Sequence, residues 1–115
     1  MRITAEPHAV AEARQHAIDA CHGCVDTQRL GDLVLAVTEL VTNAIRHGGE
    51  PVTLTVTPRD GAVRVEVCDG NPALFATAAI DDLAEGRRGL RLLDAVCTSW
   101  GWRPIDGGKC VWCEL

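Results

Sequence analysis

The longest amphipathic pattern in the chain covers residues 32–49 and predicts one helix. Apolar side chains recur there at steps of three and four residues, which is the spacing of one helix face. The members of this face are Leu30, Leu33, Val34, Val37, Leu40, Val41, Ala44 and Ile45. The glycine pair Gly48-Gly49 follows the last apolar position and is a typical helix end. We therefore expect a long central helix with one buried side.

Two segments after this helix alternate between apolar and polar residues. Residues 52–57 place valine and leucine on one face and threonine on the other, and residues 62–68 place three valines on one face. Alternation with period two is typical of half-buried strands, and the turn residues 58–61 between them predict an antiparallel hairpin. Weaker patterns predict an edge strand at 2–4, helices at 8–20 and 90–96, and strands at 99–103 and 109–115.

The order of these elements predicts the fold class. Two helices and a hairpin are followed by a loop at residues 73–85, a short helix and two more strands. This order favours an α+β two-layer sandwich, with helices packed on one face of a mixed, largely antiparallel sheet. The 115 residues suit a single domain, residues 1–115.

Charge and composition reduce the range of functions that the protein could have. The formal net charge is −5, which gives no general attraction for nucleic acid or for an anionic membrane. We find no apolar run as long as a membrane span and no signal-peptide pattern at the start. We therefore expect a cytoplasmic protein, and its six cysteines are then expected to be reduced thiols.

A polar stripe lies along the predicted central helix. Glu39, Asn43 and His47 are each four residues apart, so they stack on one side of a helix. A carboxylate and an amide oxygen one turn apart suit Mg²⁺, and the carboxylate could also accept a proton. The alternative interpretation is a solvated helix face with a hydrogen-bonded i,i+4 pair.

Two turns carry further candidate chemistry. Asp69-Gly70 ends a predicted strand; it is either an ordinary turn or a carboxylate that accepts a hydrogen bond from a base amino group. The Gly-Arg-Arg-Gly segment at 86–89 opens a predicted helix. Such a turn either is simply a loop or binds phosphate through backbone N–H groups and guanidinium donors.

Taken together, these pieces resemble the Bergerat ATP-binding fold of gyrase, heat-shock chaperones and sensor histidine kinases. Within this fold, the sequence motifs are most similar to those of the small bacterial anti-sigma-factor serine/threonine kinases. The similar stretches are TELVTNAIRHG (38–48), VRVEVCDGNP (63–72), EGRRGLRLLDAV (85–96), WGWRP (100–104) and GGKCVWCEL (107–115). The resemblance covers nearly the whole chain.

The resemblance implies roles for individual residues. Glu39 matches the general base, Asn43 the Mg²⁺ ligand, Asp69 the adenine-reading carboxylate and Gly70 the glycine beside the ring. Residues 72–85 match the lid over ATP. The nucleotide-binding set implied in this way is Asn43, Arg46, His47, Asp69, Gly70, Asn71, Gly86, Arg87, Arg88, Gly89 and Leu90.

The function implied by the resemblance is transfer of phosphate from ATP, with Mg²⁺, to a serine or threonine of an anti-sigma-factor antagonist. Protein partners would be a sigma factor, such an antagonist, or both, and a homodimer stays open. One alternative is a non-catalytic, nucleotide-dependent protein-binding switch. It is favoured by the incomplete first glycine box at residues 69–72 and by the short lid, whereas the intact Glu39 favours catalysis. Cys110 stands at a position near adenine where the family often has threonine.

A second alternative is a cysteine-ligated metal-binding domain. Cys21 and Cys24, with Cys110 and Cys113, imitate the spacing of a four-thiolate zinc site. Strand geometry argues against it, because residues three apart on a strand point to opposite faces. We expect Cys113 to pack in the core, together with Cys68 and Cys97 as small apolar side chains.

Overall fold

The computed structural model describes residues 1–72 and 92–115. The elements in chain order are β1 (Arg2–Ile3), α1 (Ala9–Cys21), α2 (Thr27–His47), β2 (Val52–Arg59), β3 (Ala62–Asp69), β4 (Ser99–Ile105) and β5 (Gly108–Glu114). Residues 92–96 are also helical. The expected loop at 73–85 and the first residues of the helix expected at 90–96 lie outside the described residues.

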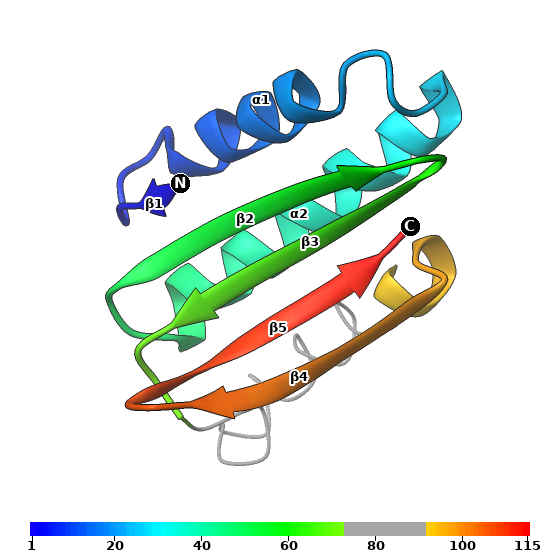
Figure 1. Cartoon of the computed structure of the whole chain (residues 1–115). Coiled ribbons are helices and arrows are strands. Elements are labelled where there is room, and N and C mark those ends of the chain that lie inside the picture. Colours follow the sequence, from blue (N-terminus) through cyan, green and yellow to red (C-terminus); the bar gives the residue numbers. More distant parts are fainter. Residues whose placement is uncertain (73–91) are drawn as a thin grey trace.

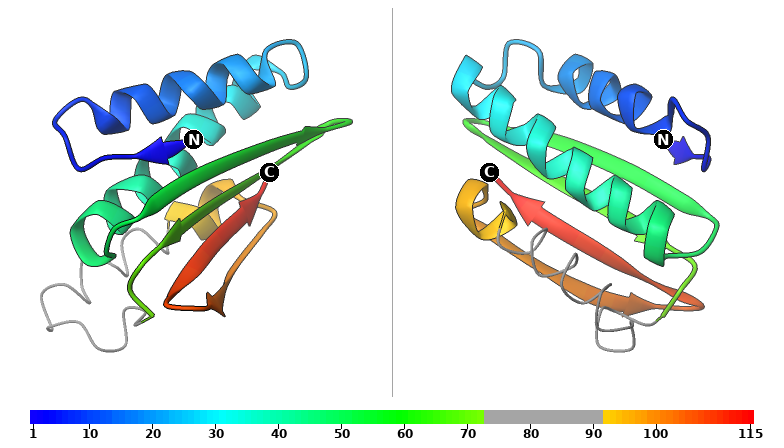
Figure 2. Two further views of the ribbon diagram at one scale, coloured as in Figure 1. Left: turned by 60° about the vertical axis from the view of Figure 1, so that its left-hand side comes forward. Right: turned by 180° about the vertical axis from the view of Figure 1, so that it is seen from behind.

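The strands form one five-stranded sheet in the order β1-β2-β3-β5-β4. Every pairing between them is antiparallel, so the mixed component that we expected is not found among the described strands. The two long helices pack on one face of the sheet, and the helical turn at 92–96 lies on the same side (Figures 1 and 2). The expected α+β two-layer sandwich is confirmed.

Helix α2 supplies the centre of the core. Its start is capped by Asp26, whose Oδ1 accepts a hydrogen bond from the backbone N–H of Arg29 at 2.8 Å. Leu33, Val37 and Val41 are fully buried, as the periodicity predicted. They belong to the same cluster as the inward-facing valines of β3. Helix α2 is therefore held against the middle of the sheet by its apolar face.

The hairpin extends further than the sequence pattern suggested. Strand β2 continues through Pro58 and Arg59, and the turn is confined to Asp60-Gly61. Proline is tolerated at this point because β1 pairs only with the beginning of β2, through residues 52 and 53. The missing N–H of Pro58 thus costs no hydrogen bond to a second neighbour. Gly61 has φ +69°, which the tight turn requires.

None of the helices in residues 1–72 and 92–115 combines the length and the apolar character needed to cross a membrane.

Candidate functional site

The second half of α2 carries the polar stripe. Glu39, Asn43 and His47 all lie within the helix and are half-buried, at the border between its apolar face and solvent. Arg46, in the last turn, is exposed. The structure therefore places a carboxylate and an amide one helical turn apart, both partly exposed to solvent. This donor set suits a hard cation such as Mg²⁺.

The end of α2 is joined to the end of β3 by backbone and side-chain hydrogen bonds. The N–H of Gly70 donates to the carbonyl oxygen of Gly49 at 2.6 Å. The side-chain amide of Asn71 donates to the carbonyl oxygen of His47 at 2.8 Å. These contacts place the Asp69-Gly70 turn directly beside the last turn of the helix. Two stretches that we singled out separately in the sequence thus form one site.

Asp69 lies at the centre of this site and is paired with Lys109. The two residues are directly opposite each other on β3 and β5. Lys109 Nζ lies 3.1 Å from Asp69 Oδ1 and 3.0 Å from Oδ2. The side chain of Lys109 is 7% exposed and that of Asp69 is 2% exposed. Asp69 Oδ1 also accepts from the N–H of Asn71 at 2.9 Å, which makes the turn after β3 an Asx-turn.

Lys109 was not among the residues that we expected at the site. Its strand was predicted, but its partner was not, because the register between β3 and β5 is not visible in local sequence patterns. One signal could have identified it. It is the single lysine in the chain, whose other ten basic residues are arginines.

Glycines allow the close approach of backbone and carboxylate here. A Cβ atom at Gly48 would lie 2.5 Å from the carbonyl oxygen of Ala44 and 2.6 Å from Cγ of Asp69. A Cβ atom at Gly108 would lie 1.9 Å from the carbonyl oxygen of Asp69, and one at Gly70 would lie 2.3 Å from that of Glu50. The site therefore has no room for side chains at these three positions.

We expect Gly48→Ala to lower the free energy of unfolding by about 1–3 kcal/mol, because the added methyl group must displace the Asp69 carboxylate or the end of α2. Gly31→Ala is the matched control: Gly31 lies in the same helix, and a Cβ atom at this position would have no neighbour within 4 Å, so it should stabilise by about 0.5–1 kcal/mol. Urea unfolding of both variants measures the difference. Equal effects of the two substitutions would contradict the close packing at Gly48.

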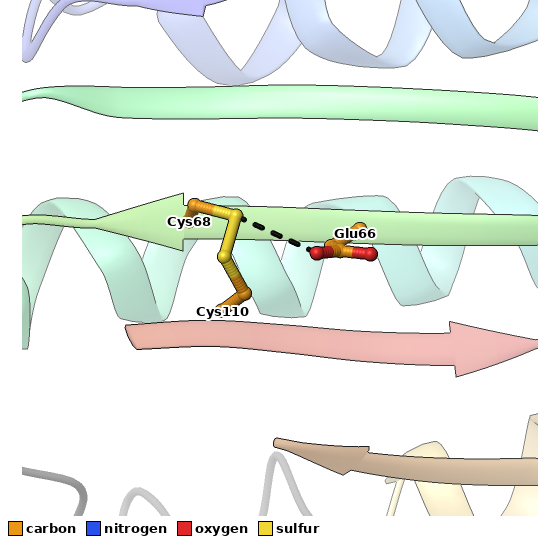
Figure 3. A group of neighbouring side chains, drawn as sticks. All are labelled: Glu66, Cys68 and Cys110. Carbon is orange, nitrogen blue, oxygen red and sulfur yellow. Dashed lines mark hydrogen bonds between the residues drawn. A yellow bond between two sulfur atoms is a disulfide. The ribbon is translucent and has the colours of Figure 1, made fainter. Parts of the chain in front are cut away.

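The cysteines correct one of our expectations. Cys68 and Cys110 are not reduced thiols but form a disulfide with an S–S distance of 1.96 Å (Figure 3). They are opposite each other in the β3–β5 register, with Cα atoms 3.9 Å apart. Cys68 is also only half-buried rather than a core residue. The bond is one residue away from the Asp69–Lys109 pair, so it links the same two strands beside the site.

The Cys68–Cys110 disulfide also bears on the cysteine-ligated metal site that we considered from the sequence. Glu66, Cys68 and Cys110 lie close enough together to surround an ion, as Figure 3 shows. However, the two sulfur atoms are bonded to each other, and Glu66 pairs with Arg103. Cys113 lies in the core, opposite Val65, on the other face of β5 from Cys110. The four cysteines with zinc-like spacing are therefore not gathered around one point.

Three of the remaining thiols, those of Cys21, Cys97 and Cys113, have shifted pKa values. Burial, together with the nearby Cys24, raises the pKa of Cys21. A hydrogen bond between the thiols of Cys97 and Cys113 lowers the pKa of Cys97 and raises that of Cys113, which is buried. Cys97 is half-buried rather than fully buried as we expected.

Part of the expected nucleotide set lies outside the described residues. It comprises Gly86, Arg87, Arg88, Gly89 and Leu90, which were assigned to phosphate binding, and the lid segment. The described part of the site thus contains the elements assigned to the base and to Mg²⁺.

Comparison with known structures supports the fold assignment. A histidine kinase domain of the blue-light activated histidine kinase from Erythrobacter litoralis EL346 superposes with a TM-score of 0.58 at 17% sequence identity. The match covers 93% of this chain and 62% of that chain. At this identity the similarity establishes the fold alone, which this chain shares with that histidine kinase domain.

Sequence comparison gives the family. The family model of the histidine kinase-like ATPase domain matches residues 3–114, and the chain belongs to this family of ATP-binding domains. An uncharacterized protein from Streptomyces coelicolor is 38% identical over 86 residues, which cover 68% of this chain and 79% of that protein. The resemblance on which we based the sequence interpretation is therefore confirmed at the level of the ATPase fold.

Proposed function

We propose that this protein binds ATP with Mg²⁺ and acts as an anti-sigma-factor-type serine/threonine protein kinase. The observation that carries the proposal is the docking of the Asp69-Gly70 turn against the end of the helix that holds Glu39 and Asn43. Base recognition and phosphate chemistry require these groups on one side of the molecule. The protein partner would be an anti-sigma-factor antagonist, a sigma factor or both, in the cytoplasm.

Each residue has a distinct role in this proposal. Asn43 would contribute its amide oxygen to Mg²⁺, which prefers few protein ligands and completes its shell with water and phosphate oxygens. Asp69 would accept a hydrogen bond from the amino group of adenine. Gly70 would lie beside the ring, at a position where a Cβ atom would meet the carbonyl oxygen of Glu50 at 2.3 Å.

Glu39 is the proposed general base. It lies one helical turn before Asn43, so a hydroxyl group that approaches the Mg²⁺-bound phosphate would come within reach of its carboxylate. Glu39 would then accept the proton of a serine or threonine as the γ-phosphoryl group moves to that oxygen. The bond to the β-phosphate oxygen breaks in the same in-line step, and ADP leaves.

The proposal predicts Mg²⁺-dependent ATP binding that depends on two residues. Isothermal titration with ATP should give binding by the wild type, and Asn43→Ala should weaken it at least about tenfold because the metal loses its only protein ligand in this assignment. Asp69→Asn should weaken it by about 10- to 100-fold, since the charged acceptor becomes a neutral amide that can present its NH₂ group to the base in place of an oxygen. Asparagine is used because alanine would leave Lys109 buried without a partner.

Arg2→Ala serves as the control, because Arg2 is exposed on the edge strand β1 and should not affect binding. Failure of a folded wild type to bind ATP would overturn the proposal. Weakening by Asp69→Asn but not by Asn43→Ala would reject the assigned metal ligand alone.

A non-catalytic, nucleotide-dependent switch is the second candidate. It is favoured by the enclosure of Asp69, whose side chain is 2% exposed and already bonded to Lys109. Tight ATP binding with no transfer of phosphate to any antagonist protein would select this function.

A further inference from the structure

The ammonium group of Lys109 is enclosed by three acceptor atoms. It contacts Oδ1 and Oδ2 of Asp69 at 3.1 and 3.0 Å and the carbonyl oxygen of Asn71 at 3.0 Å. A lysine ammonium has three N–H donors, so the number of donors equals the number of acceptors. The planar guanidinium of arginine, which the chain uses everywhere else, has five donors in a fixed fork and would not match this geometry.

The acceptor positions of Asp69 are nearly all occupied by the protein itself. An ionised carboxylate offers about four of them, two on each oxygen. Oδ1 accepts from Lys109 and from the N–H of Asn71, and Oδ2 lies 3.0 Å from the Lys109 ammonium in the ion pair. Within the part of the chain that the structure describes, one acceptor position remains, and it belongs to Oδ2. Of the two carboxylate oxygens of Asp69, Oδ2 is the one that lies closer to the Cβ position of Gly48.

We propose that Lys109 is a positioning residue that determines base specificity. By binding both oxygens of Asp69, it holds the carboxylate in one orientation and leaves a single acceptor for one exocyclic amino group of the base. A base with a carbonyl oxygen at that place would face a second acceptor and be rejected. This inference rests on the proposed function, because it deepens the role given to Asp69.

Two other interpretations of Lys109 predict different results. A purely structural ion pair would support folding without affecting the choice of base. A competing ammonium would occupy the acceptor that the base needs, and its removal would strengthen ATP binding. Competition is disfavoured by the burial of both groups, because withdrawal of Lys109 would leave a buried carboxylate and a buried ammonium unpaired.

The test compares ATP with ITP, which carries a carbonyl oxygen in place of the adenine amino group. We expect the wild type to bind ATP about 10- to 100-fold more tightly than ITP. In Lys109→Met the affinities for ATP and ITP should differ by no more than about threefold. The affinity for ITP itself should change little, because the phosphate groups are bound elsewhere. Titration calorimetry on variants shown to be folded by circular dichroism gives both affinities.

Arg64→Met is the matched control. Arg64 also lies on β3 and forms an ion pair, with Glu114 at 2.7 Å, but on the face of the sheet away from the helices. It should leave the ATP/ITP ratio unchanged. An unchanged ratio in folded Lys109→Met would overturn the inference in favour of a structural pair, and tighter ATP binding would overturn it in favour of competition.

A second measurement needs no variant, in case Lys109→Met does not fold. Because the chain has one lysine, selective ¹⁵N-lysine labelling gives one side-chain ammonium signal in NMR spectra. We expect ATP to shift this signal and tripolyphosphate not to shift it. No shift at saturating ATP, or an equal shift with tripolyphosphate, would overturn the inference.

If the wild type binds no ATP at all, both this inference and the proposed function fail. ATP binding by the wild type without the change of selectivity in Lys109→Met rejects the inference alone.

Discussion

Glu39→Ala is expected to lower the rate of phosphoryl transfer by about 100- to 10,000-fold, the usual range for loss of a general base. ATP affinity should change little, because the proposed base contacts the incoming hydroxyl group and not the nucleotide. Glu39 is half-buried on α2, and alanine favours helix at this position, so the variant should fold. The measurement is incorporation of labelled γ-phosphate into a purified anti-sigma-factor antagonist, beside a calorimetric ATP titration.

Glu39→Gln separates charge from shape in the same experiment. It keeps the size and hydrogen-bonding length of the side chain but cannot accept the proton, so it should be as slow as Glu39→Ala. Glu12→Ala, at an exposed position on α1, should transfer phosphate at the wild-type rate. Transfer retained by both Glu39 variants would remove this residue from the chemistry and leave the nucleotide site intact.

Reduction of the Cys68–Cys110 disulfide is expected to lower the free energy of unfolding by about 4 kcal/mol. The two cysteines are 42 residues apart in sequence, so the bond removes a large amount of conformational entropy from the unfolded chain. Urea unfolding with and without dithiothreitol measures the difference. The double variant Cys68→Ala, Cys110→Ala should resemble the reduced wild type and should not respond to the reductant.

Cys24→Ala controls for general effects of removing a thiol. Cys24 is free and exposed, so the variant should keep both the stability and the response to dithiothreitol. Identical unfolding of oxidised and reduced wild type, with the redox state of each sample established by mass spectrometry, would contradict the stabilising role of the bond.

The local periodicities predicted most of the fold. Helix α2 and the β2–β3 hairpin follow from patterns that lie within a few residues of each other, and their buried faces were assigned correctly at Leu33, Val37 and Val65. The ends of the strands were less accurate. Strand β2 passes through Pro58, because the structure leaves the other edge of the strand unpaired there, and no local pattern contains that information.

The sequence predicted the individual residues of the site but not how they contact one another in space. Helical spacing placed Glu39 and Asn43 together, and the strand end pointed to Asp69. The contacts that complete the site cross between strands far apart in sequence: Asp69 with Lys109, and Cys68 with Cys110. Both depend on the β3–β5 register, which is set by packing of the whole sheet. This is why a residue as central as Lys109 was missed and why two cysteines were misinterpreted as thiols.

The single lysine has a practical consequence for following the folding of this chain. A lysine-specific endoprotease has one cleavage site in residues 1–115, after Lys109, and that peptide bond lies in β5 between two paired strands. Cleavage therefore requires β5 to open, and its rate at low protease reports that opening. The released segment 110–115 would stay attached through Cys110 until the disulfide is reduced. One proteolysis experiment, analysed on reducing and non-reducing gels, would thus read out both the opening of the strand beside the site and the covalent link across it.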